Sequence, residues 1–71
     1  MSILQSFCGE EKTVSHINGS TDVRKYLANF GIIEGRKIAK AAYGHGINIY
    51  YIDDSFLALR DHEAALIEVE G

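Results

Sequence analysis

Apolar side chains between residues 20 and 31 recur at the spacing of one face of an α-helix. The stripe at i, i+3, i+4 and i+7 consists of Val23, Tyr26, Leu27 and Phe30. Ser20 or Thr21 can cap the start of such a helix by accepting a hydrogen bond from a free backbone N–H. The pattern predicts a helix that runs to about Phe30 and buries this stripe.

The end of the predicted helix is marked by glycine. Gly31 is free to adopt the left-handed backbone conformation, which costs a residue with a Cβ atom roughly 1–2 kcal/mol. Ile32 then falls where a helix-ending motif places an apolar contact back onto Leu27. The stop of the helix is therefore the best-specified local feature of the sequence.

Most of the remaining chain alternates in the manner of short β-strands. Strands are predicted at residues 13–17, 37–43, 47–52, 56–60 and 66–70, with a helical turn at 61–65. Val14 and Ile17 are three residues apart, so the first strand needs a bulge or a twist if both point inward. Turn-forming residues at 44–46 and 53–55 join three strands into a meander.

Side-chain alternation assigns the faces of these strands. In the middle strand Ile47, Ile49 and Tyr51 share the face expected to be buried, and the opposite face carries Asn48, Tyr50 and Ile52. Further on, the side chains expected to point inward are Leu57, Leu59, Ile67 and Val69. Five short strands bury little as an open sheet, and closing them removes exposed edges. The expected fold is mainly β, a small five-stranded barrel with one α-helix between the first and second strands.

Length and charge limit the possible functions. A chain of 71 residues holds one domain, residues 1–71, and its 46% apolar composition predicts that it folds. The formal charge of −3 gives no positive field for nucleic acid or anionic lipid. Cys8 stands alone, and we find neither a run of about 20 apolar residues nor a secretory signal pattern. The expected location is cytoplasmic.

The residues that could carry chemistry are scattered. His16, His45 and His62 lack the spacing of paired metal ligands, so we interpret them as ordinary polar residues; a Fe(II) or Zn(II) contact made with Cys8 or a carboxylate is the open alternative. Cys8 is expected to be a quiet, partly buried thiol. The acid pair at residues 53–54 fits a turn, and no phosphate-binding loop is present. The sequence therefore predicts no enzyme activity and no cofactor.

Exposed aromatic and basic side chains offer a different role. Tyr43, Tyr50 and Tyr51 lie on neighbouring predicted strands, so one or two should be left outside, where a ring with a polar tip suits a protein contact. Together with the helix flank, this predicts a partner-binding surface made by Arg24, Lys25, Tyr43 and Tyr50.

The order of several short motifs resembles the FeoA family of ferrous iron transport accessory proteins. The resemblance rests on Leu4, Phe7, Gly9, Glu10, Val14 and Ile17, on the run Phe30-Gly31-Ile32-Ile33-Glu34-Gly35, and on the segments 57–60 and 67–70. The family usually carries Pro where Glu34 stands, and a longer loop where this chain has residues 44–46. The resemblance implies an SH3-like barrel.

The same resemblance implies a function. It indicates a small cytosolic protein that docks on the cytosolic part of FeoB, the membrane permease with a GTP-binding domain, and regulates or assembles it. The alternative is an SH3-like interaction domain related to the C-terminal domain of iron-dependent transcriptional repressors. Neither reading involves nucleic-acid contact by this domain or insertion into the membrane, and a weak transition-metal contact stays open in both.

Overall fold

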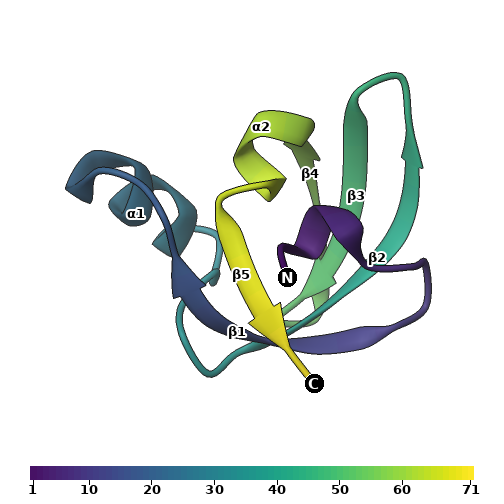
Figure 1. Cartoon of the computed structure of the whole chain (residues 1–71), viewed down its shortest axis with the longest axis horizontal. Coiled ribbons are helices and arrows are strands. Elements are labelled where there is room, and N and C mark those ends of the chain that lie inside the picture. Colours follow the sequence, from purple (N-terminus) through teal and green to yellow (C-terminus); the bar gives the residue numbers. More distant parts are fainter.

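A computed structural model describes all 71 residues. The chain forms, in order, a 3₁₀ turn η1, strand β1, helix α1, strands β2 to β4, the short helix α2 and strand β5 (Figure 1). Their bounds are η1 Ile3–Gln5, β1 Glu11–Ile17, α1 Thr21–Ala28, β2 Lys37–Gly44, β3 Ile47–Ile52, β4 Ser55–Arg60, α2 Asp61–Ala64 and β5 Ile67–Glu70. Every predicted strand and both predicted helical segments are therefore confirmed, with shifts of about two residues at their ends.

All five strands belong to one antiparallel sheet in the order β4-β3-β2-β1-β5. This is the predicted SH3-like arrangement, but the sheet is not closed, because its outer strands β4 and β5 do not pair. Instead, η1 contacts β5 and α2, and α2 contacts β3 and β4. Ile3 of η1 and Ala64 of α2 are wholly buried, so these two short elements seal the core where a strand pair would have done so.

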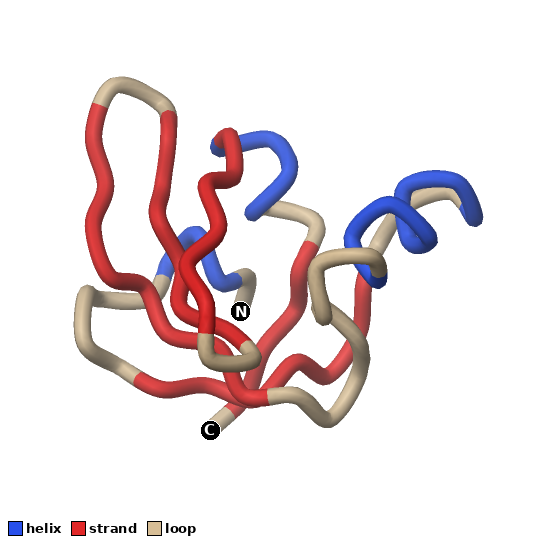
Figure 2. Tube along the Cα trace, turned by 180° about the vertical axis from the view of Figure 1, so that it is seen from behind, coloured by secondary structure: helices blue, strands red, loops and turns tan.

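Two-residue turns connect the meander. His45 and Gly46 join β2 to β3, and Asp53 and Asp54 join β3 to β4, since the flanking residues pair directly across each turn. All four turn residues have positive φ, as the hairpin turns that match strand twist require. The β2–β3 hairpin extends beyond the rest of the sheet (Figure 2).

A bulge in β1 resolves the spacing of its two apolar residues. Val14 pairs with Val69 and His16 with Glu68, so Ser15 is an extra residue on this strand. Val14 and Ile17 consequently both point inward and are buried. Of the two predicted possibilities, a bulge or a twist, the structure shows the bulge.

The buried face of β3 is the opposite of the predicted one. Asn48, Tyr50 and Ile52 are buried, whereas Ile47 and Tyr51 are about two-fifths exposed. Pairing explains this, because Ile52 lies opposite the buried Ile38 of β2. Both faces of β3 carry apolar residues, so alternation alone did not distinguish them, and the neighbouring strands decide.

The core contains twelve side chains from nearly every element. They are Ile3, Val14, Ile17, Leu27, Ile32, Ile38, Tyr50, Ile52, Leu59, Ala64, Ile67 and Val69. Of the stripe predicted for α1, only Leu27 is fully buried and Val23 partly so. Tyr26 and Phe30 instead stack edge to face on the surface, with ring centroids 5.2 Å apart. Phe7, near the N-terminus, is 76% exposed and does not belong to the core.

Candidate functional site

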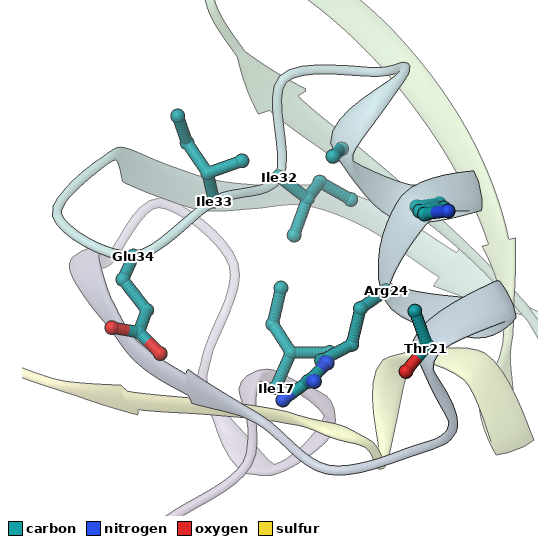
Figure 3. A pocket seen from close by; sticks show the side chains of 8 residues that line it. Ile17, Thr21, Arg24, Ile32, Ile33 and Glu34 are labelled. Atoms are coloured by element: carbon teal, nitrogen blue, oxygen red, sulfur yellow. The ribbon is translucent and has the colours of Figure 1, made fainter.

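A groove with an apolar floor lies between α1, the end of β1 and the segment that follows α1. Its volume is about 500 Å³. The lining residues are Ile17, Thr21, Arg24, Lys25, Ala28, Ile32, Ile33 and Glu34 (Figure 3). We call it the α1 groove. In Figure 3 Ile17 and Ile32 form its floor, Arg24 extends from the helix, and Ile33 and Glu34 lie on the far side.

The helix presents a second stripe to this groove. Thr21, Arg24, Lys25 and Ala28 stand at i, i+3, i+4 and i+7, so one face of α1 forms a whole wall. The helix itself begins at Ser20, whose hydroxyl accepts a hydrogen bond from the Val23 N–H at 3.2 Å. Because this face does not contact the core, its side chains are free to meet another molecule.

Backbone hydrogen bonds hold the opposite wall in place. The Ile32 N–H donates to the Leu27 carbonyl at 3.1 Å, and the Gly35 N–H donates to the Val14 carbonyl at 2.8 Å. These two bonds tie the segment between them to α1 on one side and to β1 on the other. The wall formed by Ile33 and Glu34 is therefore fixed by the fold.

The charges at the rim are unequal. Arg24 and Lys25 take part in none of the salt bridges within the chain, whereas Glu34 Oε1 lies 3.6 Å from Nδ1 of His16. All four of these side chains belong to exposed residues. Two cations without a partner therefore stand beside an apolar floor, an arrangement that suits an apolar side chain flanked by an acidic group.

Two of the four predicted contact residues meet in this groove. Arg24 and Lys25 line it, whereas Tyr43 lies on β2 near the tip of the projecting hairpin, where it is 73% exposed. Figure 1 shows α1 and this hairpin on opposite sides of the molecule. The Tyr43 ring has the Lys40 ammonium 5.5 Å from its centroid, so it is packed against its own chain on one face.

The expected exposure of Tyr50 is wrong. Tyr50 is 0% exposed, because it lies opposite Lys40 on β2 and Leu57 on β4, on the inner face of the sheet. Its hydroxyl is buried without a hydrogen-bond partner. Burial, with the nearby Asp61 and Cys8, raises the pKa of Tyr50 to about 12. Tyr50 is thus a core residue.

The residues considered for metal binding remain apart. His16 lies on β1, His45 in the β2–β3 turn and His62 on α2, and no three His, Cys, Asp or Glu side chains gather into a possible metal site. Cys8 is exposed, which corrects the expected partial burial. No helix has the length and apolar character needed to cross a membrane.

The sequence did not reveal most of the groove. Ile17 and Ile32 lie in the core and also form the floor, while Ile33 and Glu34 seemed only to lead into the next strand. The only signal was the helical spacing of Thr21, Arg24, Lys25 and Ala28, which is weak because two of the four are charged.

Fold and groove together define a small SH3-like domain with an exposed surface suited to docking. A family model described as the FeoA domain matches residues 2–71. The chain therefore belongs to the FeoA family, whose members are accessory proteins of ferrous iron transport. No curated protein matches the chain in sequence.

Solved structures share the fold at low sequence identity. A crystal structure of an iron uptake regulatory protein, FeoA, has a TM-score of 0.90 at 20% identity and covers 99% of this chain and 95% of that one. A zinc complex of Stenotrophomonas maltophilia FeoA, described as a prokaryotic SH3 domain, has a TM-score of 0.86 at 18% identity, with coverage of 99% and 89%. A manganese-dependent transcriptional repressor has a TM-score of 0.90 at 22% identity, but this chain spans only 41% of it.

Proposed function

We propose that this protein is a cytoplasmic accessory protein of the ferrous iron uptake system that docks through the α1 groove on the cytosolic part of the FeoB permease. Membership of the FeoA family supports the assignment of this chain to the ferrous iron uptake system. The S. maltophilia relative is described as possibly acting as a ferrous iron transport activating factor. The choice of docking site rests on one observation. The α1 groove has an apolar floor, and Arg24 and Lys25 at its rim form no salt bridge within the chain.

The groove fits a protein segment better than a small polar ligand. Ile33, which is 40% exposed, offers an apolar surface above the buried Ile17 and Ile32, and an aliphatic or aromatic side chain that packs there gains free energy by leaving water. Arg24 can then pair with a carboxylate at the rim, and arginine is among the side chains that most often dominate binding energy at interfaces. The expected partner segment therefore carries an apolar anchor beside Asp or Glu.

Contact, without catalysis, is the proposed mode of action. The chain would bind FeoB and alter its assembly or its regulation, with no bond made or broken by its own residues. Tyr43 would add a second, separate contact, since it is largely exposed on the hairpin across the molecule from the groove.

A binding titration against the cytosolic part of FeoB tests the proposal. Arg24→Ala and Ile33→Ala each remove one element of the groove without touching a buried core residue. We expect each to weaken binding by about tenfold or more, the range seen when a well-placed interface residue is truncated. Binding of the wild type should also weaken at higher salt concentration, because the rim contributes by charge.

Lys37→Ala is the matched control. Lys37 is an exposed cation on β2 that pairs with Glu11 at 3.9 Å and does not line the groove. Its removal changes the net charge by the same amount as Arg24→Ala and should leave the affinity unchanged. If all three variants bind like the wild type, the docking surface lies elsewhere. If the wild type does not bind, direct docking on this part of FeoB is wrong.

The repressor-related alternative depends on likeness of fold alone. The repressor match shows that the same domain architecture occurs as part of a longer protein. A role of that kind would require the groove to bind another part of a repressor, so binding to FeoB with the predicted effects of Arg24→Ala and Ile33→Ala would count against it.

A further inference from the structure

The outer face of strands β2, β3 and β4 is largely apolar, and its largest side chains are exposed. Strand pairing arranges its side chains in three rows across the sheet. The rows are Ala39-Tyr51-Phe56, Ala42-Ile49-Ala58 and Gly44-Ile47-Arg60. Only Arg60 is charged. We call this surface the meander face.

Its largest side chains remain accessible to solvent. Phe56 is 68% exposed, and Tyr51 and Ile47 are 42% and 39% exposed. The rings of Tyr51 and Phe56 contact edge to face at 5.1 Å, so they form one raised apolar corner. The largest exposed apolar patch on a monomeric protein is often a functional surface.

We propose that the meander face binds a second copy of this chain, forming a two-fold symmetric dimer in which β4 of each copy lies antiparallel over β4 of the other. A two-fold axis perpendicular to the strands at the level of Leu57 places Phe56 over the partner's Ala58 and Arg60 over the partner's Asp54. Both relationships occur twice in the dimer, as isologous symmetry requires.

Shape supports this arrangement. Ala58 is a small residue beside a hollow of about 250 Å³. The hollow has an apolar part and a charged part, and its lining residues are Tyr26, Ile47, Ala58, Leu59, Arg60 and Glu63. The exposed Phe56 ring of the other copy would enter beside this hollow. The projecting Phe56 ring and the recess at Ala58 lie one row apart on the same strand, so the face is complementary to itself.

Charge supports the same register. Arg60 is the last residue of β4 and Asp54 is the turn residue just before its first, and neither takes part in a salt bridge within its own chain. One oxygen of the Asp54 carboxylate accepts a hydrogen bond from the Tyr51 hydroxyl at 3.1 Å, which directs this carboxylate to the meander face. Antiparallel stacking is the arrangement that brings each Arg60 to an Asp54.

The size of the face predicts a weak dimer. Three strands about 4.8 Å apart and three rows about 6.7 Å apart give a footprint of roughly 300 Å² per copy. Stable complexes bury about 800 Å² per partner, so association should be visible only at high concentration, on the order of 100 µM and above. The groove residues lie on a different face of α1 from Tyr26, so the dimer would present two α1 grooves.

Sedimentation measurements between 10 µM and 1 mM test the proposal. We expect the average mass to rise from 7.9 kDa toward twice that value. Phe56→Ser should weaken association at least tenfold, whereas Phe7→Ser, which removes an equally exposed ring outside the meander face, should have no effect. A mass that stays at 7.9 kDa up to 1 mM, or equal effects of the two serine variants, would overturn the proposal.

A charge exchange tests the register. Arg60→Glu alone and Asp54→Lys alone each place like charges together in a dimer, so each variant should remain monomeric, with folding checked by its melting curve. An equal mixture of the two variants restores opposite charges at both contacts and should associate again. Failure of the mixture to associate while both variants are folded would rule out this register.

Discussion

The backbone N–H of Ile32 donates a hydrogen bond to the carbonyl of Leu27 at 3.1 Å, and both side chains are wholly buried. The Gly31 N–H donates to the Ala28 carbonyl at 2.9 Å, which completes a glycine-ended helix stop of the Schellman type. This stop turns the chain so that Ile32 enters the core and Ile33 lies at the α1 groove. The core and the candidate site therefore depend on the same turn.

Gly31→Val should destabilise the protein. Gly31 has φ +86°, a conformation that costs an ordinary residue about 1–2 kcal/mol and a β-branched one more. For a domain of this size we expect the melting temperature to fall by roughly 5–15 °C. Gly44→Ala is the control, because Gly44 does not have positive φ and has open space where a Cβ would lie. Equal melting temperatures for Gly31→Val and the wild type would contradict this account of the stop.

Leu27→Ala should unfold much of the population. Leu27 is 0% exposed and is the only fully buried residue of α1, so truncation leaves a cavity and is expected to cost about 2–5 kcal/mol. Phe30→Ala, just after the end of α1, is a useful comparison, since Phe30 is 41% exposed. Denaturant unfolding should show a much smaller loss of stability for Phe30→Ala than for Leu27→Ala.

Lys40→Met should destabilise the packing of the N-terminal segment. Lys40 is 5% exposed, and its ammonium donates to the Leu4 carbonyl at 2.7 Å, so the change leaves that carbonyl without its donor. A lost partner of this kind costs about 1–3 kcal/mol. Lys37→Met removes an exposed salt bridge in which Lys37 Nζ lies 3.9 Å from Glu11 Oε1. It should change the free energy of unfolding by less than about 0.5 kcal/mol. Similar losses in the two variants would show that the Leu4 contact is unimportant.

Tyr50→Phe should be neutral or stabilising near pH 7. The Tyr50 hydroxyl is buried without a partner, so removing it relieves an unsatisfied polar group while the ring still fills its place in the core. A large loss of stability in thermal unfolding would mean that the hydroxyl has a partner, such as an ordered water molecule.

The same substitution should change the stability at high pH. The folded protein holds the Tyr50 proton more tightly than the unfolded chain, because its pKa is raised from 10.0 to about 12. This contribution is fully present below pH 10 and is lost as the pH rises from 10 to 12. Stability of the wild type should therefore decline more steeply over this range than that of Tyr50→Phe. Parallel curves would show that Tyr50 does not titrate differently on folding.

Local chemistry in the sequence determined most of the elements. Ser20 and Gly31 mark the two ends of α1 because capping and positive φ act on neighbouring residues. The bulge in β1 followed from the spacing of Val14 and Ile17, and the turns of the meander followed from their residue types. The order of these elements predicted a small five-stranded barrel with one helix, and the resemblance of its short motifs to the FeoA family indicated the SH3-like arrangement and the family.

Tertiary structure decided which face of each element is buried. Both faces of β3 are partly apolar, so only pairing with β2 and β4 sends Tyr50 inward and leaves Ile47 and Tyr51 outside. The α1 groove arises in the same way, since Ile17, Arg24 and Ile33 are far apart in sequence or on different elements until the helix stop folds the chain back. Strand register and long-range packing are set by many distant residues together, and no local pattern contains them.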